Sequence, residues 1–394
     1  MKKDYEWLVG NNIDELIRLR ISRLKSIEIA RKLIQEKYIK HSIAIDETLL
    51  FEKAKGLSSA IDSALNYLSI SEKSLNSKIL SRYYAFLQLT IAEIVASIKN
   101  DCDLKEAQKH TEQGHGLSTL NNFTGKDFLD NYYCYLRKDG HFHYYMKQIG
   151  FRGDEKFFNE RKIKKEDKAD NVNVISLGDL FRRIPELQNV IEEYTGKCSL
   201  ALNFGLDSFS EHEENEKRRE KYSKETGKYQ FNAPPIIDKE VLTHVSIYPS
   251  SDNMTIEYLK NLDTPFKNFK MKKSSYSDEL YIVCDFFHKN EGLWWNSIKS
   301  YKSDYCPTTF IIPVFGQIDD PIIINYILMY TLSIIVRYLP DIWYEMTLGS
   351  LDNIGNLIDY YISIFDHVIP LFMLERITEK DISISMPGGF NSPV

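Results

Sequence analysis

One apolar run, residues 322–336, constrains the fold of this chain more than any other feature. Its 15 residues are almost all apolar, with Asn325 inside the run and Arg337 directly after it. A helix that spans a membrane needs about 20 such residues, so the run predicts a helix buried in a large core. A chain of 394 residues with 43% hydrophobic residues can form such a core, and its length favours two or three domains.

Composition excludes several classes of protein. The 50 basic and 56 acidic residues give a formal charge of −6, which argues against a disordered tail or a surface covered with nucleic-acid-binding charge. A local basic patch stays compatible with this balance. The N-terminus has no apolar segment of the signal-peptide type, so we expect a cytoplasmic protein and no membrane partner.

The cysteines predict neither a disulfide framework nor a zinc site, because they are widely spaced and form no CxxC pair. We expect buried thiols and no metal or other cofactor. The sequence also lacks the motifs of P-loop ATPases, dinucleotide enzymes, zincins and α/β-hydrolases. The five cysteines are Cys102, Cys134, Cys198, Cys284 and Cys306.

The first third of the chain predicts helices. An apolar stripe runs from Ile13 to Ile27, and similar spacings predict helices over about 50–68, 77–99 and 126–136. Gly140 is a plausible C-cap for the last of these. Arg82 opens a core helix, where a guanidinium is expected to bridge a carboxylate or carbonyl groups.

The centre of the chain has a different pattern. Two charge-dense segments, 152–170 and 211–228, predict solvated excursions. Short runs rich in β-branched and aromatic residues predict strands over 241–248, 280–286 and 309–315. Helical spacing then returns over 323–338 and 357–368, and Pro370 is expected to end the second of these helices.

These patterns predict a mainly α protein with a small inserted β element, an α+β fold. We expect a helical bundle domain over residues 1–150. A charged linker with short helices follows over 151–235. Residues 236–394 are expected to form the small β element and then a C-terminal pair of core helices.

Several segments resemble the bacterial YaaC-like proteins. Residues 332–343 (LSIIVRYLPDIW) are close to the C-terminal signature of that family, and the match extends over roughly residues 55 to 375. The resemblance implies a widespread bacterial protein of unassigned activity. The other matching segments are 81–86 (SRYYAF), 115–117 (HGL), 175–180 (ISLGDL) and 184–187 (IPEL).

The N-terminal part of this pattern is also similar to HEPN helical bundles. That resemblance implies a role in toxin–antitoxin or antiviral defence systems, either as a metal-independent ribonuclease or as an inactive binding module. Active members carry an Arg, then four to six residues, then a His. Arg137 and His143 fit this spacing, and an imidazole can move the 2′-OH proton while a guanidinium holds the phosphate.

Each of these candidate site residues also has a structural interpretation. A pair with the spacing of Arg137 and His143 arises about once by chance in a chain of this composition. His141 and His115 could assist catalysis, although a histidine such as His115 more often caps a helix by hydrogen bonding. Aromatic residues between Tyr132 and Tyr145 could line a cleft or stack on bases.

Basic side chains offer further candidates. Arg337 interrupts an apolar helix and predicts a structural ion pair, with Asp341 as the nearest partner by spacing and Glu345 or Asp352 as alternatives. A ligand anchor is the second interpretation of Arg337. A basic first helix could bind nucleic acid through Arg18, Arg20, Arg23, Lys25, Arg31 and Lys32.

The sequence therefore favours a binding or assembly component, with a protein partner or a second copy of the chain, in a defence or stress system. The alternative is a HEPN-type metal-independent endoribonuclease that uses Arg137 and His143. RNA or another nucleic acid is a candidate ligand in both cases.

Overall fold

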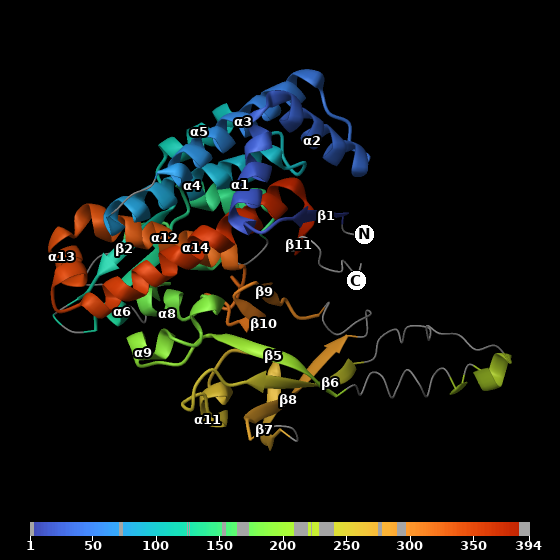
Figure 1. The fold of residues 1–394 in the computed structure, drawn as a ribbon, viewed down its shortest axis with the longest axis vertical. Coiled ribbons are helices and arrows are strands. Elements are labelled where there is room, and N and C mark those ends of the chain that lie inside the picture. Colours follow the sequence, from blue (N-terminus) through green and yellow to red (C-terminus); the bar gives the residue numbers. More distant parts are fainter. Residues whose placement is uncertain are drawn as a thin grey trace. The chain divides into compact units, whose positions relative to one another are not determined.

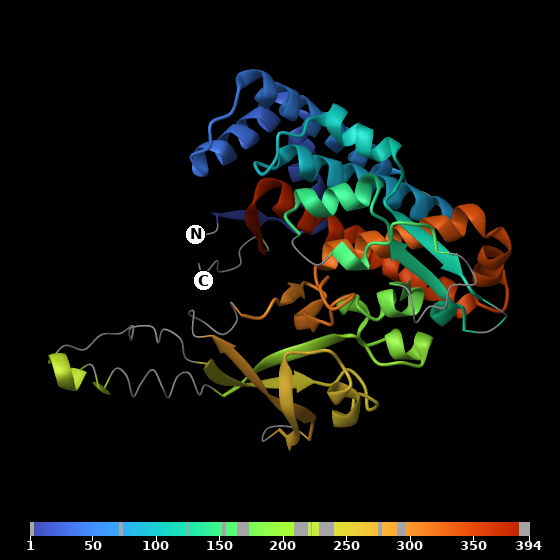
Figure 2. The ribbon, with the colours of Figure 1, turned by 180° about the vertical axis from the view of Figure 1, so that it is seen from behind.

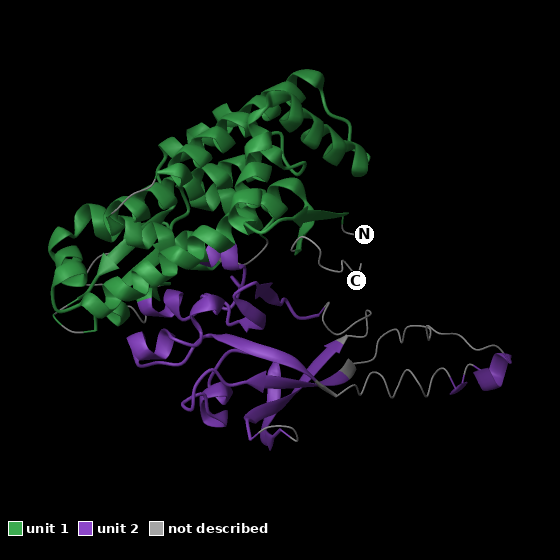
Figure 3. Ribbon diagram, in the orientation of Figure 1, with its two compact units in different colours: residues 1–177, 325–394 green, residues 178–324 purple. Residues whose placement is uncertain are grey.

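A computed structural model gives the fold of the chain (Figure 1). It describes residues 4–70, 74–123, 125, 127–151, 155–163, 173–208, 220–221, 223–227, 240–274, 278–289 and 297–385. The protein is mixed α/β, with 53% helix and 21% strand. Two compact units divide it, and the first combines both ends of the chain: residues 1–177 and 325–394 form unit 1, and residues 178–324 form unit 2 (Figure 3).

Unit 1 is built mainly from helices. Polar caps start several of them: Asn12, Ser26, Asp46, Ser74 and Asp103 each accept a hydrogen bond from a backbone N–H in the first helical turn. The long helices are α3 (Glu47–Ser69), α4 (Leu75–Ala96), α12 (Pro321–Tyr338) and α14 (Asp352–Thr378). The shorter helices are α1 (Ile13–Ser22), α2 (Ile27–Lys40), α5 (Leu104–Glu112), α6 (Phe128–Asn131), α7 (Gly140–Gln148) and α13 (Pro340–Leu348), with 3-10 turns at Arg23–Lys25 and Glu155–Phe157.

The two ends of the chain meet in unit 1. Strand β1 (Asp4–Val9) pairs in parallel with β11 (Lys380–Ser385), and Figures 1 and 2 show these strands side by side. A separate antiparallel sheet has the order β2 (Leu117–Asn121), β3 (Tyr132–Leu136) and β4 (Ile175–Ser176). In the sequence, the whole of unit 2 lies between the two parts of unit 1, and the pairing of β1 with β11 joins those two parts.

Three helices, α4, α12 and α14, are long and apolar enough to cross a membrane by length and composition. Their most apolar 18-residue windows are 78%, 72% and 61% buried within the fold. The expected core helix over 323–338 is therefore confirmed as α12. All five cysteines are buried thiols, which confirms the expectation.

Unit 2 is organised around one six-stranded antiparallel sheet, with the strand order β7-β8-β6-β5-β10-β9. Buried apolar side chains cover one face, among them Leu202, Phe204, Val245, Ile247 and Ile282. Its strands are β5 (Ala201–Ser208), β6 (Glu240–Tyr248), β7 (Phe266–Lys273), β8 (Leu280–Lys289), β9 (Tyr301–Ser303) and β10 (Cys306–Ile311). The remaining elements are α8 (Leu177–Phe181), α9 (Ile191–Thr195), α11 (Ile256–Lys260) and a 3-10 turn at Pro185–Leu187.

The observed fold corrects several predictions. The expected small β element is a full six-stranded sheet, and the predicted division at residues 150 and 235 does not coincide with the two units. The predicted helix over 126–136 is wrong: α6 ends at Asn131, and the apolar run after it forms β3. Pro370 lies inside α14, which continues to Thr378. The charged segments 152–170 and 211–228 lie mostly outside the described residues.

A bidentate ion pair connects the early helix α4 with the late helix α14. Arg82 Nε and Nη2 donate to the two carboxylate oxygens of Asp366, each at 2.8 Å, and Nη1 donates to the carbonyl of Ile70 at 3.1 Å. The Arg82 side chain is 8% exposed. The prediction that Arg82 bridges a carboxylate and a carbonyl is confirmed.

We expect Arg82→Ala to lower the free energy of unfolding by about 3 kcal/mol, because it leaves a partly buried carboxylate without its partner. Lys78→Ala is a matched control, since Lys78 and Asp359 join the same two helices across 3.6 Å but are far more exposed. Lys78→Ala should lower the free energy of unfolding by less than about 1 kcal/mol. Urea unfolding measures both values, and equal losses would contradict this account of the pair.

Candidate functional site

Three side chains from distant parts of the sequence meet in unit 1. The hydroxyl of Tyr83 on α4 lies 2.6 Å from Nδ1 of His115, and their ring centroids are 5.7 Å apart. The guanidinium carbon of Arg337, at the end of α12, lies 5.8 Å from the centroid of the Tyr83 ring. We call Tyr83, His115 and Arg337 the His115 site.

A turn between two glycines holds His115. Gly114 and Gly116 have φ values of +112° and +75°, which residues with a Cβ rarely adopt. The peptide N–H of Phe142 donates to the carbonyl of His115 at 3.0 Å. The turn is therefore fixed against the first residues of α7, and with it the position of His115.

The backbone of the turn around His115 and the start of α7 approach so closely that the first residue of α7 must be a glycine, Gly140. A Cβ on Gly140 would lie 2.5 Å from the carbonyl oxygen of Gly114. The peptide N–H of His141 donates to that same oxygen at 2.9 Å, which satisfies an amide in the first turn of α7. Gly140 thus begins a helix, and the predicted C-cap at this position is wrong.

Tyrosines on α12 complete the packing around His115. The ring of Tyr330 lies 5.5 Å from the His115 ring and 6.0 Å from that of Tyr83, and its hydroxyl donates to the carbonyl of Leu117 at 2.8 Å. Arg337 follows Tyr330 by two helical turns, on the same side of α12. The helix therefore places an aromatic ring against His115 and a guanidinium beside the ring of Tyr83, to which His115 is hydrogen-bonded.

The guanidinium of Arg337 is half-buried and has no carboxylate partner among the described residues. Its Nε and Nη2 donate to the carbonyl and hydroxyl oxygens of Ser333 at 3.1 and 3.2 Å. It also lies 5.2 Å from the ring centroid of Tyr338. The predicted ion pair with Asp341 is not formed, because Pro340 starts a new helix and Asp341 lies exposed in its first turn.

The electrostatics of the His115 site favour an anion. Burial, and secondly the charge of Arg337, lower the pKa of the His115 imidazole below its ordinary value of 6.5. The imidazole is therefore neutral at pH 7. If the Tyr83 hydroxyl donates to Nδ1, then Nε2 carries the proton and is a second donor beside the guanidinium.

His141 cannot act as an exchangeable acid or base near neutral pH. It is fully buried, its Nε2 lies 2.9 Å from the hydroxyl of Thr90, and burial lowers its pKa to about 3. Tyr145, on the next turn of α7, is also buried and donates to Glu93 at 2.6 Å. These contacts give His141 a structural role in the core between α4 and α7.

Arg137 and His143 lie on different elements. Arg137 follows β3 and pairs with Asp139, whose carboxylate accepts from Nη2 at 2.6 Å and from Nε at 3.3 Å. His143 lies on α7, with its ring 4.8 Å from that of Phe158 and Nε2 shielded from solvent. Asp139 therefore already occupies the guanidinium that a ribonuclease would use to hold phosphate.

The basic N-terminal segment forms two helices with a 3-10 turn between them. Carboxylates neutralise half of its predicted nucleic-acid contacts, because Arg20 pairs with Glu6, Lys25 with Asp62 at 2.7 Å, and Arg31 with Glu47 at 2.5 Å. No ion pair is described for Arg18, Arg23 or Lys32. Of the tyrosines at 132–145, Tyr132, Tyr135 and Tyr145 are fully buried, so they pack in the core.

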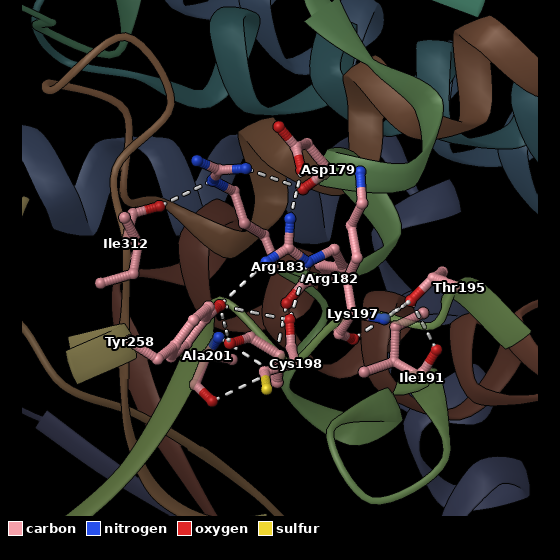
Figure 4. A network of polar contacts seen from close by, with 11 residues as sticks. Asp179, Arg182, Arg183, Ile191, Thr195, Lys197, Cys198, Ala201, Tyr258 and Ile312 are labelled. Atoms are coloured by element: carbon pink, nitrogen blue, oxygen red, sulfur yellow. Dashed lines mark hydrogen bonds and ion pairs between the residues drawn. The ribbon is translucent and has the colours of Figure 1, made fainter. Parts of the chain in front are cut away.

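Unit 2 contains an arginine pair that the sequence did not indicate (Figure 4). Arg182 donates to the Asp179 carboxylate, the Cys198 carbonyl and the Tyr258 hydroxyl at 2.7–2.8 Å. Arg183 donates to the carbonyls of Ile312 and Asp179 at 2.8 Å, and burial lowers its pKa to about 10. These bonds tie the end of α8 to the segment before β5, to α11 and to the segment after β10.

No cluster of three or more His, Cys, Asp or Glu side chains that could hold a metal ion occurs in the described part of the chain. The donors at the His115 site are an imidazole, a guanidinium and a phenol. Such a set suits an anion rather than a cation.

The low pKa of His141 predicts a pH dependence of stability. Below about pH 6.5 the unfolded chain takes up a proton at this position that the folded chain takes up only near pH 3. His141 therefore contributes its full stability above pH 6.5, and that contribution is lost as the pH falls. Its slope can reach about 1.4 kcal/mol per pH unit.

Urea unfolding of the native protein and His141→Gln, at pH values between 7 and 4, measures this effect. We expect a shallower loss of stability with falling pH in the variant, because glutamine does not titrate. The same slope in both proteins would contradict the buried, neutral histidine.

Comparison with known proteins gives one match. The model of the family described as YaaC-like Protein matches residues 22–377. All three side chains of the His115 site lie within this range. No curated protein matches the chain, and no solved structure matches it.

Proposed function

The chain belongs to the YaaC-like protein family, and on that premise we propose that it is a binding protein for a phosphate-bearing anion. One observation carries the proposal: Arg337 is a half-buried guanidinium without a carboxylate partner among the residues that the structure describes. A charge in this position is costly unless an anion compensates it. A bound phosphate would supply that compensation.

The neighbours of Arg337 support a phosphate more than a carboxylate. A phosphate has several acceptor oxygens, so it can accept from the guanidinium and from Nε2 of His115 together. The ring of Tyr338, which is 65% exposed, lies beside the guanidinium and offers a surface for an organic group attached to the phosphate. A phosphate monoester with an aromatic group, such as a nucleotide, fits this combination.

Contacts of the other candidates support binding rather than ribonuclease activity. Asp139 engages Arg137, and His141 is buried with a pKa of about 3. Neither is set up for the proton transfer and phosphate contact that cleavage of RNA requires. We therefore propose a binding component and not a HEPN-type endoribonuclease.

A phosphate titration tests the proposal. Calorimetry with inorganic phosphate and with adenosine 5′-monophosphate should show saturable binding to the native protein. We expect Arg337→Gln and His115→Gln each to weaken binding by about tenfold or more. The first variant removes a charged hydrogen-bond donor, and the second removes the neutral Nε2 donor. Arg161→Gln is the matched control, an exposed arginine outside every candidate site that should leave the affinity unchanged.

Two results would contradict the proposal. One is no binding of either phosphate compound at low ionic strength. The other is equal binding by the native protein and Arg337→Gln, because the anion would then lie elsewhere. Acetate as a third probe shows whether a carboxylate binds as tightly as phosphate.

We further propose that the protein assembles with a partner protein or a second copy of itself. Tyr5, Trp7 and Val9 alternate along β1 and are 61%, 44% and 49% exposed. They form an apolar strip on a two-stranded sheet, in which β1 has an edge without a described strand partner. We propose a role in a cytoplasmic defence or stress system only on the resemblance of the N-terminal sequence pattern to HEPN bundles, which is an argument by analogy.

Light scattering after size exclusion tests self-association through this strip. We expect Trp7→Glu to shift the protein toward the monomer, because a buried carboxylate opposes the contact. Tyr360→Glu alters a tyrosine of α14 with similar exposure, 46%, and should leave the mass unchanged. If the native protein is monomeric at high concentration, self-association through this strip is excluded. The proposed partner would then be a different protein.

A further inference from the structure

The sheet of unit 2 has a second face, opposite its apolar core, which we call the open face. The register between strands shows which residues lie side by side on this face. Lys272 of β7 lies opposite Tyr281 of β8, and Lys270 lies opposite Val283. Because neighbouring side chains on a strand alternate between faces, Ile282 on the core face places these four residues on the open face.

A β-bulge places one more lysine on this face. Register between β7 and β8 shifts between Lys267 and Lys270, so that Lys267 lies opposite Asp285, two positions from Val283. Asn268, the extra residue, adopts a φ of +55°, which asparagine tolerates better than most residues. Without the bulge, Lys267 and Lys270 would point to opposite faces.

The edge strand β7 is strongly basic although the chain is acidic overall. It carries four lysines and no acidic residue, against a net charge of −6 for the protein. No ion pair is described for Lys267 or Lys270. The nearby carboxylate of Asp285 accepts from Asn268 at 2.7 Å and lies 2.9 Å from Nδ1 of His244, so its two oxygens already have partners.

Two tyrosines stand beside these lysines on the adjacent strands. Tyr248 of β6 and Tyr281 of β8 have ring centroids 6.2 Å apart, at an interplanar angle of 33°. Tyr248 is 49% exposed. Its ring lies over Gly205 of β5, where a Cβ would come within 3.3 Å of it, so the absence of a side chain at Gly205 leaves room for the Tyr248 ring.

Two hollows border this face, each also lined by residues of the core side. One of about 640 Å³ is lined by Lys260, Lys267 and Lys270 among others, with Asp285 as its acidic residue. Another of about 880 Å³ is lined by Ser246, Tyr248 and Tyr281 among others, with Asp252, Asp278 and Glu279 as its acidic residues. A ligand along the open face therefore meets lysines at the sheet edge and the two tyrosines farther in, with carboxylates also lining the second hollow.

We propose that the open face binds single-stranded nucleic acid. Lys267 and Lys270 of β7 contact the phosphates, and bases stack on Tyr281 and Tyr248, one and two strands inward, at the strand spacing of about 5 Å. Unpaired bases expose the faces that such stacking needs, and a duplex does not. This site lies entirely in unit 2, so it goes beyond the proposed function and does not depend on the His115 site.

Fluorescence anisotropy with labelled oligo-deoxythymidine and oligo-uridine tests the proposal on the full chain. Tyr248→Ala and Tyr281→Ala should each weaken binding by about tenfold. The double variant Lys267→Gln, Lys270→Gln should weaken it and lower the slope of log K against log salt by about 0.7 for each lysine. Comparison of the two oligonucleotides separates DNA from RNA as the preferred ligand.

Matched variants control for charge and for aromatic content. Lys273 lies on the same strand but on the other face and pairs with Asp278 at 2.6 Å, so Lys273→Gln should change the affinity little. Tyr360→Ala removes an exposed tyrosine of α14 and should have no effect. Arg337→Gln should also bind oligonucleotide normally, so failure here is distinguishable from failure of the proposed function.

Absence of binding to both oligonucleotides at low salt would overturn the proposal. So would a loss of binding in the lysine variant with none in either tyrosine variant, since that pattern describes a site for any polyanion. Circular dichroism and thermal unfolding of each variant must match the native protein. A tyrosine-to-alanine variant that fails this check is replaced by Tyr248→Leu or Tyr281→Leu. Leucine keeps an apolar side chain but removes the aromatic ring.

Discussion

The ion pair between Arg82 and Asp366 is the contact on which the helical unit most depends. The two residues are 284 positions apart, and the pair fixes α14 against α4 after the chain has passed through the whole of unit 2. Tyr83 follows Arg82 directly and points to α12 and the turn that carries His115. A charge pair in the core thus determines where the neighbouring polar site can form.

Glycines and prolines set the rest of that site. Gly140 lets the start of α7 approach the turn around His115, and the two backbone hydrogen bonds there hold the imidazole in place. The helix α12 ends at Tyr338 and a new helix begins at Pro340, so Asp341 does not pair with Arg337. Among the residues that the structure describes, the guanidinium therefore has no carboxylate partner, and the proposed anion site rests on this observation.

Much of the helical framework could be predicted from the sequence. Residues with a helical period gave α3, α4 and α12 nearly in full, because long amphipathic or apolar helices carry a strong periodic signal. The apolar run after Asn131 fits a helical period, but it forms β3, which pairs with β2 and β4. Strands β1 and β11 were missed, since each is stabilised by a partner at the other end of the chain. Pro370 did not end α14, because the packing of residues on both sides outweighs one lost hydrogen bond.

The candidate site could be predicted only in part. Arg337 was identifiable as a costly charge in an apolar run, and His115 as a histidine between two glycines. Their meeting at Tyr83 was not, because sequence spacing carries no information about contacts across more than 200 residues. The pairing of Arg137 with Asp139 was likewise not predictable, because the local spacing of Arg137 and His143 does not indicate which side chain contacts the arginine.

The pKa of His115 tests most directly whether these distant residues form one site. Histidine NMR across a pH titration measures it in the native protein, in Arg337→Gln and in Arg23→Gln. We predict a pKa below 6.5 in the native protein and a higher value in Arg337→Gln, because the variant removes a positive charge that opposes protonation. The value in Arg23→Gln should equal that of the native protein. An unchanged pKa in Arg337→Gln would contradict the account.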